Sequence, residues 1–233
     1  MNSNQPLGPL VHSAHARRPE RKILEGRVVK LVPLDARVHG EDLFAAASGQ
    51  DQIWTYMGDG PYPDRAAFQS NLEDKARSED PLFFAVIDKA SGRALGYQTL
   101  MRIDATNRVV EVGNILFSPS MQRTVGATEA QYLFARYAFE ELGYRRYEWK
   151  CNDLNAPSKR AAERYGFAFE GVFRQHMIVK GHNRDTAWFS MLDSEWPSRR
   201  AAFEAWLAPD NFDPEGRQKQ SLAALRSAAN HYP

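Results

Sequence analysis

The order of strand-like and helix-like stretches between Arg108 and Leu192 constrains the fold of this chain more than any other feature of its sequence. Two apolar stretches typical of strands, Arg108–Phe117 and Arg146–Cys151, flank a stretch from about 127 to 142. In that middle stretch the apolar side chains recur at helical spacing, which predicts a helix with one buried face. A strand, a helix and a second strand in succession place the two strands parallel in one sheet.

Further strands and helices are expected on both sides of this unit. The strands are predicted at Gly26–Leu34, Leu82–Asp88, Ala94–Arg102, Ala168–Val179 and Thr186–Leu192, the last two joined by residues 180–184. The helices are predicted at about 36–47 after Asp35, from Asp64 to about Ser78, from Asn155 to Gly166, and twice in the tail after Trp196. The predicted fold class is therefore α/β, with a mixed, mostly antiparallel sheet around a central parallel pair.

These elements divide the chain into three parts. Residues 1–22, rich in Asn, Pro, His and Arg, are predicted to form a flexible arm, and residues 23–195 form the α/β domain. Residues 196–233 are predicted to form a C-terminal helical extension with an apolar stripe made of Trp196, Phe203, Trp206 and Leu207. This stripe is expected to pack on the domain itself, and the alternative is that it docks a partner or makes a homodimer.

Composition excludes several classes of protein. The chain has 30 Lys and Arg against 29 Asp and Glu, a balance that gives no reason to expect nucleic-acid binding. No apolar run is long enough for a membrane span, and no apolar segment follows the basic N-terminal residues as in a signal peptide. Cys151 is the single cysteine, which excludes an internal disulfide and fits a cytoplasmic protein. No cluster of residues has metal-ligand spacing, so no metal is expected.

A glycine-bearing loop, Gln122–Ala127, lies between the strand that ends near Phe117 and the helix that follows. Glycine lets the backbone approach a ligand closely, and the first N–H groups of a helix lack partners within the helix. The helix dipole favours an anion at this end, and Arg123 adds a positive charge. Taken alone, the loop is more often an ordinary turn, since glycines between a strand and a helix are common. It matches neither of the glycine patterns that bind dinucleotides or nucleoside triphosphates.

Several other motifs occur in a fixed order along the chain. They are Glu111-Val112-Gly113, Asn155-x-x-Ser158, Arg164-Tyr165-Gly166-Phe167, Glu170-Gly171 and Gly181-x-x-Arg184-Asp185. In this order they resemble the GCN5-related N-acetyltransferase (GNAT) superfamily, and within it the Rim-type subgroup, which is similar to ribosomal-protein acetyltransferases. The resemblance covers about residues 24–194. The loop departs from the family form Q/R-x-x-G-x-G/A. When the motif is aligned from Arg123, Gly126 stands at the expected position, but Ala127 follows it directly and the residue between them is missing.

The resemblance implies that the protein uses acetyl-CoA as a co-substrate and that its central parallel strands splay apart. It places the pantetheine arm against the backbone of Ile115, Leu116 and Phe117. It places the pyrophosphate on the loop and the first helical turn, formed by Gln122, Arg123, Thr124, Val125, Gly126, Ala127 and Thr128. It also implies that Asn155 bonds the pantetheine arm and that Ser158 lies near the thiol.

Direct acetyl transfer needs a neutral amine and a proton for the leaving thiolate. Glu111 stands on the strand beside the expected reaction centre and is the candidate base; the alternative is a solvated or salt-bridged strand residue. Where many related enzymes have a tyrosine acid, this chain has Ala162. Ser158 or water is the expected substitute, and helix capping is the alternative role for Ser158. Cys151 is not expected to be a nucleophile, because no His lies near it in the sequence.

The acceptor is expected to be a primary amine, either a protein N-terminus or a small molecule, and the sequence does not select between them. Trp54, Tyr56 and Met57 form an aromatic loop that is a candidate acceptor pocket, with anchoring in the core as the alternative. Because the tyrosine acid is missing, a non-catalytic protein that binds acetyl-CoA as a ligand or sensor is the alternative function.

Overall fold

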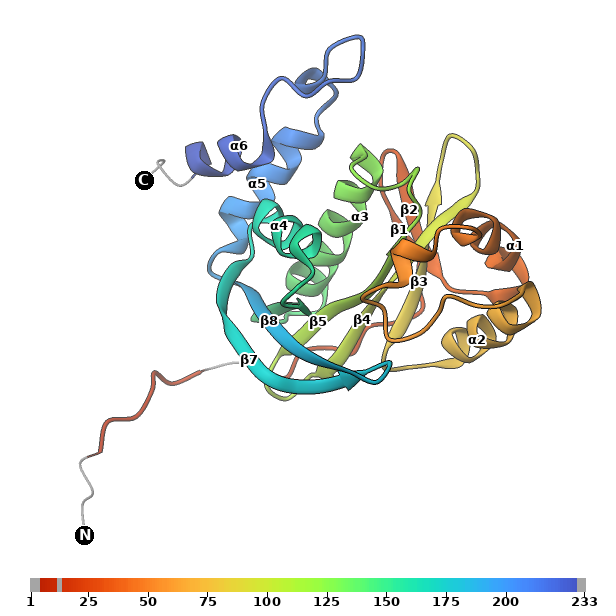
Figure 1. Ribbon diagram of the computed structural model, residues 1–233. Coiled ribbons are helices and arrows are strands. Elements are labelled where there is room, and N and C mark those ends of the chain that lie inside the picture. The colour runs from red at the N-terminus through yellow and green to blue at the C-terminus, as the bar shows by residue number, and fades with distance from the viewer. Residues whose placement is uncertain (1–4, 12–13, 230–233) are drawn as a thin grey trace.

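A computed structural model describes residues 5–11 and 14–229 of the chain, and a single eight-stranded sheet lies at its centre (Figure 1). The strands are β1 (Leu24–Glu25), β2 (Val29–Pro33), β3 (Leu82–Asp88), β4 (Ala94–Asp104), β5 (Val109–Phe117), β6 (Arg146–Asn152), β7 (Ala168–Val179) and β8 (His182–Leu192). Their order in the sheet is β1-β2-β3-β4-β5-β6-β8-β7, with β5 and β6 parallel and the other described neighbours antiparallel. The predicted α/β fold class, with its central parallel pair, is confirmed.

Helices cover both faces of the sheet (Figure 1). They are α1 (Ala36–Ala47), α2 (Arg65–Arg77), α3 (Val125–Arg136), α4 (Ala156–Tyr165), α5 (Trp196–Leu207) and α6 (Leu222–Ala229), with short helical turns η1 (Asp51–Trp54), η2 (Tyr137–Glu141) and η3 (Pro209–Asn211). Side chains of α1 and α2 pack with one set of alternating residues of β3 and β4, including Phe83 and Tyr97. Side chains of α3 and α5 pack with the opposite set, including Phe84 and Leu100, so the molecule has two cores separated by the sheet.

The starts of α1, α2 and α4 follow from their capping residues, as predicted. The Asp35 carboxylate accepts hydrogen bonds from the N–H groups at the start of α1, and Asp64 does the same for α2. Asn155 caps α4, and Gly166 ends that helix with a φ of 95°, in the left-handed region that glycine adopts without strain.

The first predicted strand, Gly26–Leu34, is confirmed over Val29–Pro33 as β2, but its first three residues form a turn that separates β2 from β1. The N–H of Gly26 donates to the Val29 carbonyl, which closes the turn. The carboxylate of Glu129 on α3 then accepts three hydrogen bonds of 2.7 or 2.8 Å from the backbone N–H groups of residues 27–29. The turn is therefore fixed by the side chain of Glu129, about midway along the sequence. Local sequence patterns around the turn do not reveal such a distant contact.

Two further boundaries differ from the sequence prediction. The last hairpin closes through Lys180 and Gly181, whose φ angles of 50° and 77° allow a tight turn, so β8 begins at His182 and not at Thr186. The helix expected from about 127 begins at Val125, and its last turn is a π-helix, η2. A π-turn shifts the side chains of that turn around the helix axis, and the apolar spacing did not signal it.

The first C-terminal helix, α5, packs within the main core of the protein. The ring of Trp196 stacks on Phe139 with centroids 5.3 Å apart, and the ring of Phe203 stacks on Tyr165 at 6.2 Å. At the other end of the chain, the Ala16 N–H donates to the Ala105 carbonyl at 3.0 Å, and Ala16 is buried. Among the helices of the described ranges, none is both long and apolar enough to cross a bilayer.

Candidate active site

The parallel strands β5 and β6 are paired over only the first part of their length. The ladder runs from Val109, opposite Arg146, to Val112, opposite Trp149. Beyond that point β5 continues to Phe117 against β4, and β6 continues to Asn152 against β8. The two strands therefore part after Val112 and Trp149, and the splayed central pair that the resemblance implies is confirmed.

The part of β5 beyond this split has a free edge. Leu116 and Phe117 pair with β4 on one side, and on the other side no ladder pair to β6 is present for residues 115–117 in the described chain. The register between β4 and β5 shifts here, and Asn114 in the shifted region has a φ of 46°. Such an irregularity bends a strand away from its neighbour. It leaves main-chain groups along one edge that an extended ligand can pair with.

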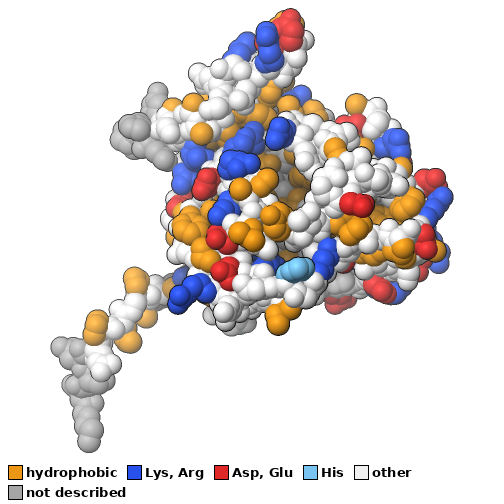
Figure 2. All heavy atoms as spheres, in the orientation of Figure 1, with side chains coloured by type: hydrophobic (Ala, Val, Ile, Leu, Met, Phe, Trp, Pro, Cys, Tyr) orange, Lys and Arg blue, Asp and Glu red, His pale blue; other side chains and the backbone are white. Residues whose placement is uncertain are grey.

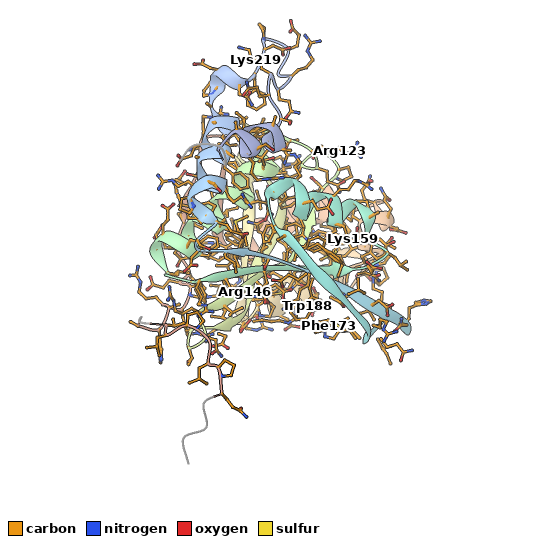
Figure 3. All side chains as sticks on the ribbon, turned by 90° about the vertical axis from the view of Figure 1, so that its left-hand side faces the viewer. Arg123, Arg146, Lys159, Phe173, Trp188 and Lys219 are labelled. Carbon is orange, nitrogen blue, oxygen red and sulfur yellow. The ribbon has the colours of Figure 1, made fainter. Side chains whose placement is uncertain are left out.

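Backbone donors also stand unpaired at the start of α3. Thr124 caps this helix, and its hydroxyl accepts from the Ala127 N–H at 3.1 Å. Within the described ranges, nothing accepts a hydrogen bond from the N–H groups of Arg123, Thr124, Val125 or Gly126. Arg123 is exposed and projects outward from the loop (Figure 3). Free N–H groups at a helix N-terminus, beside a positive side chain, can hold an anion.

Gly126 is required here by packing. A Cβ atom at this position would lie 2.8 Å from Val29 Cγ1 and 3.4 Å from Met121 Cε, so only glycine lets the first turn of α3 approach β2 this closely. Gln122 also has a structural contact, since its Nε2 donates to the Phe117 carbonyl at 2.9 Å. That bond links the loop to the end of β5, which brings the free N–H groups next to the free strand edge.

Thr128, the last residue of the predicted pyrophosphate site, is buried. Its hydroxyl accepts a hydrogen bond of 3.0 Å from Arg164 Nη1 of α4. The Arg164 guanidinium lies 4.9 Å from the ring centroid of Trp206 on α5. The Thr128 side chain is therefore engaged with the neighbouring helices, and its backbone N–H bonds the Thr124 carbonyl at 3.4 Å.

On the other side of the split, α4 begins with the predicted pair Asn155 and Ser158. The Asn155 Oδ1 accepts from the Ser158 N–H at 3.1 Å, which leaves the amide Nδ2 of Asn155 as a donor. The Ser158 hydroxyl does not cap the helix; its Oγ accepts from Trp149 Nε1 at 3.0 Å. Cys151 lies beside Ser158, and burial raises the pKa of its thiol, which disfavours the nucleophilic thiolate.

Glu111 lies at the end of the paired region, where two cations hold one oxygen of its carboxylate. Arg102 Nη1 is 2.6 Å and Lys150 Nζ 2.9 Å from Oε2, and the side chains of Glu111 and Lys150 are only 4% and 5% exposed. The other oxygen, Oε1, is the one near Gly113, the first residue beyond the split. Glu111 is thus salt-bridged, as the alternative interpretation held, yet both ion pairs use Oε2 and leave Oε1 as an acceptor.

The ion pairs continue across the sheet beyond Glu111. Lys150 also binds Glu148 at 2.6 Å, and Arg146 binds Glu148 at 2.6 Å and Glu170 at 2.8 Å. Ser190 donates to Glu170 at 2.7 Å. The hydrogen bond from Arg146 lowers the pKa of the Glu170 carboxyl. We call the face of the sheet that carries these side chains, and also Arg184 of β8, the charged face.

Glu111 and Ser158 flank the split from opposite faces of the sheet. Val110 and Val112 are buried in the core beneath α3, so Glu111 between them points to the opposite face. Ser158 contacts Trp149, which belongs to the same core as the two valines. A group placed in the split therefore has the carboxylate on one side and the hydroxyl on the other.

The β7–β8 hairpin reaches the segment around η1. Lys180 Nζ donates to the Trp54 carbonyl at 2.8 Å, and the Tyr56 hydroxyl donates to the Leu154 carbonyl at 3.1 Å. Trp54 is buried edge-on against Tyr62, so this tryptophan anchors the core, whereas Tyr56 is partly exposed. Figure 2 shows that this side of the molecule is hollowed near its centre, with apolar side chains inside and Lys and Arg side chains at its upper rim.

Sequence reasoning missed the cations of the charged face. Arg102 and Lys150, which hold Glu111, and Arg184 were not predicted as site residues. The alternation of Glu148 and Lys150 in a short predicted strand was the available signal, because two charges on one face of a central strand need partners. In the described ranges, no group of three His, Cys, Asp or Glu side chains is arranged to hold a metal ion.

A mixed sheet that splits between its two parallel strands, with the N-terminus of a helix beside the split, is the fold of an N-acetyltransferase. Comparison with known families agrees, because residues 29–168 match the acetyltransferase (GNAT) domain. The chain belongs to this family and is an N-acetyltransferase, and the family implies the use of acetyl-CoA.

Similar proteins support this assignment. The crystal structure of a GCN5-related N-acetyltransferase from Brucella melitensis is 56% identical, covers 93% of this chain and 99% of its own, and superposes with a TM-score of 0.91. A Bacillus subtilis protein named "Putative ribosomal N-acetyltransferase YdaF" is 29% identical over 47% of this chain and 59% of its own length. An uncharacterized N-acetyltransferase, p20, of Bacillus licheniformis is 26% identical over 62% of this chain and 83% of its own. The match thus spans about three fifths of the Bacillus subtilis relative.

Proposed function

We propose that this chain transfers the acetyl group of acetyl-CoA directly to a primary amine, either a protein N-terminus or a small-molecule amine. The observation that carries the proposal is the split after Val112 and Trp149, which lies beside the unpaired N–H groups at the start of α3. This combination suits an extended ligand with an anionic group along its length.

The chain's own groups fit acetyl-CoA at this place. The free edge at Ile115–Phe117 would pair with the pantetheine arm, and the N–H groups of the loop from Arg123 onward would hold the pyrophosphate. Asn155 would donate from Nδ2 to the pantetheine arm. Acetyl-CoA supplies the acetyl thioester, whose carbon–sulfur bond breaks as the new carbon–nitrogen bond forms.

Glu111 is the proposed base for the amine. Its Oε2 is fixed by Arg102 and Lys150, so the carboxylate keeps one orientation, and Oε1 near Gly113 is available to accept the proton that the amine nitrogen releases. A water molecule between the amine and Oε1 would serve the same transfer.

Ser158 is the proposed donor to the leaving thiolate. Trp149 Nε1 donates to Oγ at 3.0 Å, which orients the hydroxyl, and Ser158 keeps its own proton as a donor beside Cys151. Ala162, which stands where many relatives have a tyrosine, is fully buried and offers no acidic group. A protein N-terminus as acceptor is supported by the name of the Bacillus subtilis relative, which is called a ribosomal N-acetyltransferase.

The test is a thiol-release screen with acetyl-CoA against amines, amino acids and N-terminal peptides, combined with calorimetry of acetyl-CoA binding. We expect acetyl-CoA to bind, and we expect the CoA thiol to be released in the presence of at least one class of acceptor. Cys151→Ala should keep its turnover, because direct transfer needs no thiol on the protein. Loss of turnover in this variant, together with an acetyl group trapped on the wild-type protein, would contradict direct attack. Binding with no transfer to any acceptor would instead favour the non-catalytic function.

A further inference from the structure

The charged face has one cation more than it has carboxylates. Its cations are Arg102, Arg146, Lys150 and Arg184, and its carboxylates are Glu111, Glu148 and Glu170. The first three cations form ion pairs with these carboxylates, whereas Arg184 has no Asp or Glu oxygen within ion-pair distance in the part of the chain that the structure describes. Arg184 belongs to the Gly181-x-x-Arg184-Asp185 motif, and no step of the acetyl transfer uses it.

The Arg184 guanidinium is held below the surface without a strong acceptor. Its Nη1 lies 3.6 Å from the sulfur of Met177, which is a weak acceptor. Its Nε is buried, and no described atom accepts a hydrogen bond from it. Burial lowers the pKa of Arg184, while the nearby Cys151 and Glu111 favour its charged form. An unpaired donor of a buried charged group is costly, so a partner from outside the chain is expected.

The unpaired edge of the Arg184 guanidinium has the geometry that a carboxylate requires. With Nη1 turned toward Met177, the Nε and Nη2 atoms form the remaining edge of the guanidinium. Two parallel N–H groups on one edge bind both oxygens of a carboxylate at once, whereas a carboxamide offers a single acceptor oxygen. Strand alternation places Arg184 on the same face of the sheet as Glu111, whose ion pairs are with Arg102 and Lys150 and not with Arg184. The space considered below is the region of this face between Glu111 and Arg184.

The neighbouring residues of β8 give this space an aromatic wall. Trp188, two positions beyond Thr186 on the same face, packs against Phe173 with ring centroids 4.4 Å apart, and both lie over the same part of the sheet in Figure 3. The indole Nε1 of Trp188 is a second buried donor with no described acceptor. His176 Nδ1 lies 2.9 Å from the Thr186 hydroxyl and closes the wall. The space is therefore lined by donors and rings, which suits a small acidic group.

We propose that the acceptor is an amine that also carries a carboxylate, and that Arg184 binds this carboxylate through its Nε–Nη2 edge while Glu111 serves the amine. The inference rests on the proposed amine acetylation, for which it names the substrate class. Two sources have this chemistry: a free amino acid, and a peptide whose N-terminal residues include Asp or Glu.

The experiment compares acids with their amides, using binding as well as turnover. Glycine, β-alanine and γ-aminobutyrate are each titrated by calorimetry against the full-length protein in the presence of CoA, alongside their carboxamides. Tripeptides with Asp at the second position are compared with the same peptides carrying Asn. We expect at least one acid to bind about tenfold more tightly than its amide, the difference of a bidentate charged pair. The acid–amide pair that shows this difference identifies whether the acceptor is a free amino acid or a peptide.

The variant Arg184→Met should abolish this preference. We expect it to raise KM for the acid with little change in kcat, to leave binding of acetyl-CoA unchanged, and to melt no lower than wild type, because it removes an unpaired buried charge. Arg184→Lys should restore only part of the preference, since an ammonium cannot bind both oxygens in one plane. Arg174→Met, which removes an exposed arginine of the same hairpin, is the matched control and should behave as wild type.

The outcomes separate this inference from the proposed function. Equal binding of acids and amides by the wild type, or a preference that survives in Arg184→Met, would overturn it. So would weaker acetyl-CoA binding or a lower melting temperature in that variant, because Arg184 would then serve the cofactor or the fold. If acids bind preferentially but no amine is acetylated, the carboxylate site stands and the proposed acetyl transfer fails.

Discussion

The two sides of the split are built from different parts of the chain. On the α3 side, the groups available to a ligand are backbone N–H groups of the loop at 123–126 and the free edge of β5. On the charged face they are side chains, with Glu111 and Lys150 nearly inaccessible and linked to one another. The first site follows from the fold itself, since any residue has an N–H group. The second depends on which residues the sheet brings together.

This difference determines which substitutions each side of the split tolerates. A backbone site should withstand replacement of its exposed side chains and fail when the packing of its helix is disturbed. A site of coupled side chains should fail when one charge is removed, even if the shape is kept. The following substitutions test this contrast, beginning with the largest expected effect.

Glu111→Gln keeps the shape but removes the charge that Arg102 and Lys150 share. Lys150 would stay buried with Glu148 as its remaining partner, and we expect a loss of about 3 kcal/mol in the free energy of unfolding. Turnover should fall about 100-fold if Oε1 is the base. Chemical denaturation and steady-state kinetics measure the two effects. The control is Glu41→Gln, at a carboxylate that is 73% exposed, which should change neither. Wild-type stability in Glu111→Gln would show that the charges are not coupled.

Gly126→Val tests the backbone side. The new side chain would meet Val29 and push the start of α3 away from β2, at a cost of about 2 kcal/mol. Because the free N–H groups move with the helix, acetyl-CoA should bind more weakly in calorimetry. Gly58→Val, where an added Cβ meets no atom within 4 Å, should leave both quantities unchanged. Unchanged acetyl-CoA affinity in Gly126→Val would remove the loop from the cofactor site.

Ser158→Ala removes the acceptor of the Trp149 indole N–H. The unpaired donor should cost about 1 kcal/mol, and kcat should fall about tenfold, since a thiolate leaves readily without full protonation. Ser158→Thr keeps the hydroxyl and should retain most of the activity. If Ser158→Ala turns over as fast as wild type, water supplies the proton.

Glu170→Gln should have the smallest effect, and that effect should disappear in acid. Arg146 lowers the pKa of Glu170 from its usual 4.5 by hydrogen bonding, so the charged form is favoured in the folded state. That contribution is complete above pH 4.5 and is lost as the pH falls through the lower folded-state pKa. The variant should therefore lose less stability than wild type between pH 6 and pH 3, on the order of tenths of a kcal/mol, since the pair is partly exposed. Melting temperatures across this range measure it, and identical slopes would contradict it.

The sequence predicted features that depend on neighbours along the chain. Local patterns account for the bounds of β3 and β7, for the helix caps at Asp35 and Asn155, and for the unpaired start of the helix after β5. The turn at the start of the first predicted strand was not predicted, because Glu129 fixes that turn from α3. The functional roles of the loop, Asn155, Ser158 and Glu111 stay predictions.

The cations of the charged face escaped for the same physical reason. Arg102 is on β4 and Lys150 on β6, and they meet at Glu111 only because β5 lies between these strands in the sheet. Strand order is set by the whole core, so the partners of a buried charge cannot be identified from spacing alone.

The position of α5 in the main core has a consequence for how the chain is made. Trp196 and Phe203 complete the same core as Tyr132 of α3, and Glu129 of α3 in turn fixes Val29, 100 residues earlier. During synthesis on the ribosome, the earlier strands and helices must wait with their apolar faces uncovered until α5 has left the exit tunnel. A nascent chain that stops before Trp196 would thus remain a target for chaperones and proteases, although every residue of the proposed acetyl-CoA site has already been made.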